Sequence, residues 1–273
     1  MRKRSVGGPT FLQLTTRTLD NGGTAIWTGA GNIFLTDAVI TNRPGGLFNV
    51  QNTALLSFAG GAPRFDNAGT FRKSANTGTT TVSGVSFNNY GLVELQSGIL
   101  SSFGGYFSAS NSLLSSTIGG TNAGTGFGQL QVSGPITVNG GLGVSLTNGF
   151  TPVLNDSFAV LTAGSRSGAF TSFAYPSNLV TMQLNNTTNS VVVVVTGVAN
   201  PAPQLLMPKI SGTNVTLTWT AVSNLTYRLE FNPNLTPSNW SALGADVTSQ
   251  SNFASKVDSL TPTNRFYRVR LLP

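Results

Sequence analysis

Residues 65–72 read FDNAGTFR and residues 87–94 read FNNYGLVE, so aromatic, asparagine, glycine and charged positions recur in the same order in the two segments. The two segments begin 22 residues apart. A single coil of this length cannot bury its apolar side chains alone. Such a repeat is typical of solenoids, in which each coil packs between its neighbours. A looser copy, ITNRPGGLF, precedes the pair at residues 40–48. The repeat therefore predicts a stack of β-coils.

Aligning the two copies places side chains one above the other, about 4.8 Å apart along the stack. Arg72 then lies beside Glu94, and we interpret them as a structural ion pair between neighbouring coils; an acid/base or substrate-binding pair is the functional alternative. Asn67 and Asn89 share a register position, and Asn111 lies one further period beyond Asn89, which predicts an asparagine stack. The competing interpretation is that these are independent turn asparagines.

The composition excludes several classes of active site. The chain has 273 residues with no cysteine and no histidine, which removes disulfides, thiolate nucleophiles, Ser-His-Asp triads and histidine metal sites. The net charge is +7, but the basic residues are spread along the chain rather than clustered. We therefore expect no nucleic-acid binding and no cofactor.

The N-terminal segment, residues 1–19, begins with the charged sequence MRKRS but continues with only a short apolar part, FLQL at residues 11–14. A secretory signal needs about 7 to 15 apolar residues and a membrane helix about 18, so neither is visible. We expect this segment to be disordered or incomplete, and the chain to be a monomer without a membrane span. Either the protein is soluble inside the cell, or the chain is the C-terminal part of a longer exported protein, which its composition favours.

Two-residue alternation of apolar and polar residues, as in NVTLTW at residues 214–219, predicts an all-β chain. The β-coil region with its terminal strands is expected to span residues 20–198. Alternating prolines indicate a stiff linker at residues 199–204, followed by a second domain at residues 205–273.

Several strings in the second half of the coil region resemble the end of the β-helical passenger of autotransporter-like bacterial surface proteins: GFGQLQVSG (126–134), GVSLTNGFTP (143–152), DSFAVLT (156–162) and SGAF (167–170). The resemblance covers roughly residues 24–197. It implies a parallel β-helix, usually right-handed in that family, in a secreted or cell-surface protein. The shared motifs are structural, so the resemblance implies no catalytic residues.

The C-terminal domain resembles a fibronectin type III sandwich through VTLTW (215–219), TYRLE (226–230), Trp240 and SLTPTNRFYRVR (259–270). The resemblance implies that Trp219 is the buried core tryptophan and that Leu260 and Tyr267 form a corner. The usual last strand is missing from the pattern.

We therefore expect a non-catalytic, structural or adhesive part of an extracellular or cell-surface bacterial protein. Its expected partners are surface polysaccharide or the export and sorting machinery. The first alternative is a carbohydrate-binding module or adhesin, with glycan contacts through the aromatic residues Tyr90, Tyr106 and Trp240.

The second alternative is a β-helical polysaccharide lyase or hydrolase. Its candidate site is the charged cluster formed by Arg64, Asp66, Arg72, Lys73 and Glu94. Paired-carboxylate hydrolysis needs two acids at a defined separation, whereas the repeat places Asp66 and Glu94 at opposite ends of a strand. We accordingly predict no enzymatic activity.

Overall fold

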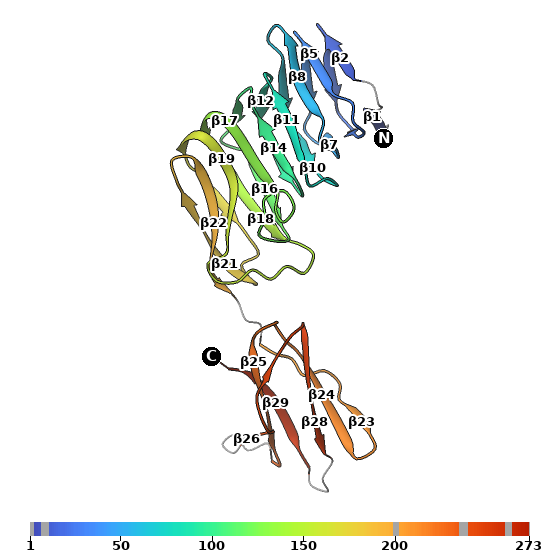
Figure 1. The fold of residues 1–273 in the computed structure, drawn as a ribbon, viewed down its shortest axis with the longest axis vertical. Helices are drawn as coiled ribbons and strands as arrows, with labels where there is room; N and C mark the ends of the chain where they lie inside the picture. Colours follow the sequence, from blue (N-terminus) through green and yellow to red (C-terminus); the bar gives the residue numbers. More distant parts are fainter. Residues whose placement is uncertain (1–2, 7–10, 199–201, 235–239, 260–263, 273) are drawn as a thin grey trace. The chain divides into compact units, whose positions relative to one another are not determined.

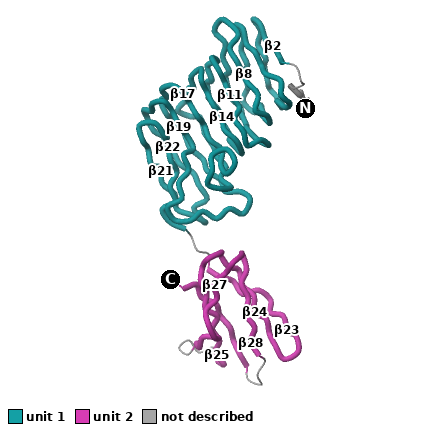
Figure 2. Tube along the Cα trace, in the orientation of Figure 1, with its two compact units in different colours: residues 1–199 teal, residues 200–273 magenta. Residues whose placement is uncertain are grey.

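The computed structural model describes residues 3–6, 11–198, 202–234, 240–259 and 264–272. The chain divides into two compact units, residues 1–199 and 200–273 (Figure 2). All named elements in the described ranges are β-strands, so the expected all-β class is confirmed. The described residues of unit 1 form three sheets, built largely from parallel strand pairs, and those of unit 2 form two antiparallel sheets.

In unit 1, successive strands pass from one sheet to the next, and along most of the stack each pairs in parallel with the strand three places later in the chain (Figure 1). The first sheet has the order β1 (Lys3–Val6), β4 (Thr24–Trp27), β7 (Leu47–Val50), β10 (Thr70–Lys73), β13 (Leu92–Leu95), β16 (Leu113–Ile118), β18 (Gly141–Leu146) and β20 (Ser172–Ala174).

The second sheet has the order β2 (Leu12–Thr15), β5 (Ile33–Thr36), β8 (Leu55–Gly60), β11 (Thr79–Ser83), β14 (Ile99–Ser102), β17 (Gln129–Val138), β19 (Ser157–Gly168), β22 (Ser190–Val198) and β21 (Val180–Asn186). The third sheet has the order β15 (Tyr106–Ser108), β12 (Ser86–Asn89), β9 (Arg64–Asn67), β6 (Val39–Asn42) and β3 (Thr18–Asn21). The last strands of the second sheet, β19, β22 and β21, pair antiparallel and end its parallel stacking.

The short strands alternate inward apolar and outward polar side chains, so every coil contributes to one continuous core. Phe65 pairs in register with Phe87, and their rings stack with centroids 5.0 Å apart and an interplanar angle of 4°. Phe71 meets Phe65 edge-on at 5.4 Å. Burying such rings in offset and edge-to-face contacts favours one register, because a slip by one residue would turn them outward.

Residues 1–19, for which the sequence predicted disorder or an incomplete segment, contribute β1, β2 and the start of β3. Leu12 and Leu14 pair in register with Ile33 and Leu35, so this part is organised by the coil beside it. Such short strands carry too little periodicity of their own to be recognised in the sequence. Of the predicted linker, residues 199–201 lie outside the described ranges.

Unit 2 consists of two sheets. One has the order β23 (Lys209–Ser211), β24 (Asn214–Thr220) and β28 (Phe253–Ser259); in the other, β25 (Thr226–Asn232) pairs with β26 (Ser241–Ala242), β27 (Val247–Thr248) and β29 (Phe266–Leu271). Trp219 is fully buried in a core with Leu217 and Tyr227. Leu260 lies outside the described residues, and the Tyr267 hydroxyl donates to Asp258 Oδ2 at 2.8 Å.

Candidate functional site

A ladder of asparagine side chains connects successive coils of unit 1. Asn21 Nδ2 donates to Asn42 Oδ1 at 2.7 Å, Asn42 Nδ2 to Asn67 Oδ1 at 2.8 Å, and Asn67 Nδ2 to Asn89 Oδ1 at 2.8 Å. The last three residues are fully buried. Because amide groups hydrogen-bond on both sides, the ladder satisfies polar groups that would otherwise be costly to bury at a corner.

Asn111 does not join this asparagine ladder, and its predicted place in the stack was wrong. The residue in register with Asn89 on the following coil is Ser108, because that coil is shorter than the repeat. Asn111 itself is exposed in a turn. Asn89 Nδ2 donates instead to the Leu113 carbonyl at 3.4 Å.

Arg72 and Glu94 are in register on β10 and β13, and Arg72 Nε donates to Glu94 Oε2 at 2.6 Å. Gln96 Nε2 donates to the other carboxylate oxygen at 2.9 Å. The pair is only partly buried, which is typical of structural pairing between neighbouring strands.

The charged cluster of the enzymatic alternative is divided between sheets and between the interior and the surface. Arg64 and Asp66 form their own ion pair at 2.7 Å on β9 of the third sheet, whereas Arg72 and Glu94 belong to the first sheet. Lys73 points into the core and is fully buried. The five side chains therefore do not converge on one surface.

Lys73 has a structural environment that the sequence did not reveal. Its Nζ donates to the backbone carbonyls of Asn52 at 3.2 Å and Asn76 at 3.4 Å. Burial lowers the pKa of its ammonium group from 10.5 to about 8. The side chain thus stabilises two loop carbonyls at the cost of a partly desolvated charge.

Tyr90 and Phe107 form an exposed aromatic pair beside the last strands of the third sheet. Their exposed fractions are 44% and 50%, and their ring centroids lie 5.7 Å apart with an interplanar angle of 54°. Tyr106, predicted to be an outward glycan contact, is buried and stacks on Phe87 at 5.6 Å. The shorter coil brings Tyr106 into register with Phe87, so Phe107 faces outward in its place. Burial raises the pKa of the Tyr106 phenol.

Polar side chains continue from the aromatic pair along the outer face of the third sheet. Asp66, Asn88 and Phe107 occupy successive rungs of one register position. Asp66 Oδ1 accepts a hydrogen bond from Asn88 Nδ2 at 2.8 Å, and its other oxygen accepts from Arg64. We call Asp66, Asn88, Tyr90 and Phe107 the aromatic-polar surface. Its apolar rings beside carboxylate and amide groups match the apolar faces and hydroxyls of sugars.

Trp240 lies in unit 2 and is partly buried. The Arg268 guanidinium lies over its ring, 4.4 Å from the centroid, and Arg268 Nε also donates to Glu230 Oε2 at 2.6 Å. A cation held over an indole by its own carboxylate partner is a stable arrangement. One face of Trp240 is therefore covered by protein, which leaves Tyr90 and Phe107 as the more accessible aromatic pair.

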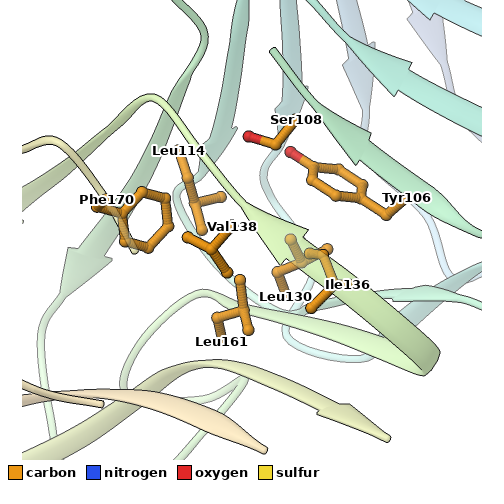
Figure 3. A pocket seen from close by; sticks show the side chains of 8 residues that line it. All are labelled: Tyr106, Ser108, Leu114, Leu130, Ile136, Val138, Leu161 and Phe170. Atoms are coloured by element: carbon orange, nitrogen blue, oxygen red, sulfur yellow. The ribbon is translucent and has the colours of Figure 1, made fainter. Parts of the chain in front are cut away.

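Two hollows lie among the described residues of unit 1, one in the core and one on the outer surface. One narrow gap in the core has no room for a water molecule. Figure 3 shows the side chains that line it: Tyr106, Ser108, Leu114, Leu130, Ile136, Val138, Leu161 and Phe170. A shallow groove of about 320 Å³ crosses the outer face of the second sheet, beside Phe103 and Gln131. The gap in the core is a packing irregularity where the Tyr106 ring meets aliphatic side chains.

Comparison with known proteins adds no functional assignment. No protein-family model matches the chain, and no curated protein matches it. Within the described ranges, no helix has the length and apolar character needed to cross a membrane. The asparagine ladder, the ion pairs and the aromatic-polar surface are therefore the features of the chain that bear on its function.

Proposed function

We propose that unit 1 is a parallel β-helix that serves as a stiff structural or adhesive part of a secreted or cell-surface bacterial protein similar to autotransporter passengers. The observation that carries the proposal is the coil-on-coil pairing of β1 to β15 in three sheets, joined at one corner by the asparagine ladder. Such stacking makes each coil depend on its neighbours, so bending or local unfolding disrupts several sheets together.

The arrangement of charges supports a non-catalytic role. Asp66 and Glu94, the carboxylates of the enzymatic alternative, belong to different sheets, and each is engaged by an arginine. Paired-carboxylate hydrolysis requires two carboxyl groups facing one bond. Strand pairing accounts for both ion pairs without a substrate.

For unit 2 we propose a fibronectin type III-like sandwich that engages the attachment or export machinery. Two antiparallel sheets enclose the buried Trp219, and β29 pairs with β25 at one edge, as the penultimate strand of such a domain would.

The location can be tested on intact cells of the bacterium that encodes the protein. Antibodies raised against residues 20–198 should label unpermeabilised cells or recover the protein from the medium. External protease should remove the cell-bound signal while a cytoplasmic marker remains. Labelling only after permeabilisation would refute a surface or secreted role.

A second candidate function, glycan adhesion, is favoured by the aromatic-polar surface. A sugar ring can stack on Tyr90 or Phe107 while its hydroxyls reach Asp66 and Asn88. On a glycan array, the double variant Tyr90→Ala, Phe107→Ala should lose binding that the wild type shows. The exposed Phe58 is a matched control, and Phe58→Ala should retain it. Equal loss in both variants, or no bound glycan, would refute adhesion through this surface.

A further inference from the structure

The groove on the outer face of the second sheet is built by three neighbouring strands. β14, β17 and β19 lie side by side, and Ser101, Gln131 and Thr162 occupy one register position across them (Figure 1). The register position just before it is fully buried in the core: Leu100, Leu130 and Leu161. Because side chains alternate along a strand, Ser101, Gln131 and Thr162 face outward, and all three line the groove.

A β-bulge produces the hollow. The register between β17 and β19 shifts after Val132, so that residues 133–134 of β17 lie opposite the single residue Gly164 of β19. A Cβ atom on Gly164 would lie 2.5 Å from the Ser133 carbonyl oxygen, closer than a side chain can approach. The extra residue bends the strand and the bare glycine adds nothing to the floor, which leaves about 320 Å³ of open space. This volume is at the lower end of the range of small-molecule sites.

A relay of amide groups holds Gln131 in place within the groove. Gln129 is buried, and its Nε2 group donates to the Ala159 carbonyl at 2.7 Å. Gln131 Nε2 donates in turn to Gln129 Oε1 at 2.8 Å. Among the described residues, none donates a hydrogen bond to Gln131 Oε1. The relay therefore leaves this oxygen as a preorganised acceptor for a ligand hydroxyl.

Phe103 supplies an exposed aromatic ring at the same groove. It directly follows β14, and its backbone N–H donates to the Val82 carbonyl at 2.8 Å, which fixes its position beside the sheet. The side chain is 59% exposed and lines the groove together with Gln131. An aromatic face beside amide and hydroxyl groups offers both stacking and hydrogen bonds to one ligand.

The chemistry of the lining selects among ligands. None of the described side chains that line the groove carries a charge, so an anion or a cation finds no partner there. β17 is paired on both sides, so the groove has no free strand edge to which an extended peptide could add. A wholly apolar ligand would leave the polar groups of Gln131 and Thr162 without partners. A neutral sugar satisfies both kinds of surface.

We propose that this groove binds a neutral sugar unit of a glycan, with the C–H face of the ring on Phe103 and hydroxyl groups at Gln131 Oε1 and the Thr162 hydroxyl. The site goes beyond the proposed structural role, because coil stacking alone requires no relay and no exposed ring at this bulge. It is also separate from the aromatic-polar surface, which lies on the third sheet, and does not depend on binding there.

The test uses the full chain and four neutral disaccharides: cellobiose, laminaribiose, maltose and lactose. Digalacturonate serves as the charged comparison. Saturation-transfer NMR should detect binding of at least one neutral sugar, and calorimetric titration should show its affinity weakened about tenfold by Phe103→Ala and by Gln131→Leu. Binding of none of the four, or a preference for digalacturonate, would overturn the inference.

Two controls assign the binding to this groove. Phe58→Ala removes an exposed ring from β8 of the same sheet and should bind the sugar as the wild type does. The double variant Tyr90→Ala, Phe107→Ala should also retain the affinity. If the double variant loses binding while Phe103→Ala retains it, the sugar binds the aromatic-polar surface and only the present inference fails. An unchanged urea midpoint of Phe103→Ala, whose ring is exposed, shows that its loss of affinity is not a loss of folding.

Discussion

Replacing one asparagine of the ladder should lower the free energy of unfolding of unit 1 by more than the loss of one hydrogen bond would, because each buried asparagine takes part in several. Asn67 accepts from Asn42 Nδ2 at 2.8 Å and donates to Asn89 Oδ1 at 2.8 Å and to the Leu92 carbonyl at 2.9 Å. Asn67→Ala deletes all three hydrogen bonds at a fully buried position. At about 1 kcal/mol each, with an added penalty for the buried carbonyl, the free energy of unfolding should fall by about 3 to 4 kcal/mol.

Urea unfolding of the full chain, followed by fluorescence and circular dichroism, measures this loss. The matched control is Asn111→Ala, since Asn111 is exposed and outside the asparagine ladder; its effect should stay within about 0.5 kcal/mol. A loss below about 1 kcal/mol for Asn67→Ala would refute the ladder as a stabilising element. Equal losses at the two positions would do the same.

Three further outcomes follow from the charged groups. Lys73 has a folded pKa of about 8 against 10.5 in the unfolded chain, so the unfolded chain binds more protons between these values and stability rises with pH. From about pH 7.5 to pH 11, the free energy of unfolding of the wild type, measured with urea, should rise by about 3 kcal/mol relative to that of Lys73→Met. If the difference between the two free energies does not change with pH, the buried position of the Lys73 ammonium is contradicted. A double-mutant cycle on Arg72→Ala and Glu94→Ala should give a coupling of about 0.5 kcal/mol, and more than about 2 kcal/mol would point to a role beyond surface pairing. Burial opposes ionisation of Asp258, but hydrogen bonds from Arg265 and the Tyr267 hydroxyl outweigh it and lower the carboxyl pKa. The stability that Asp258 contributes to unit 2 should therefore be present above about pH 4 and disappear as the pH falls through the lower folded pKa, whereas Asp258→Asn should remove this dependence in acid unfolding.

The coil register could be predicted from the sequence only where two coils have equal length. Between β9 and β12 the two copies of the repeat superpose as the sequence indicates, with Phe65 beside Phe87 and Asn67 beside Asn89. The next coil is shorter, so counting on by the same period led to Asn111 instead of Ser108. The register between two strands depends on how many residues the corners between them contain, and this number differs from coil to coil. A fixed repeat length therefore does not predict the register of every coil.

The shorter coil also decides which aromatic ring belongs to the aromatic-polar surface. Tyr106 and Phe107 are adjacent, so a change of one position in strand alternation decides which ring enters the core. The sequence identified Tyr90 as outward but not its partner. The cation over Trp240 comes from Arg268, on a strand distant from it in the sequence, and no local pattern predicts that contact.

The most direct test of the stacked-coil account is a cysteine cross-link between β10 and β13, in a chain that contains no natural cysteine. Arg72→Cys with Glu94→Cys places two thiols in register on neighbouring strands, within the separation that a disulfide can bridge. Arg72→Cys with Gln96→Cys places the second thiol just after the end of β13, two residues out of register. Mild oxidation under native conditions should join the first pair rapidly and leave the second reduced. Equal oxidation of both pairs, or preferential oxidation of the second, would contradict the coil register on which the account rests.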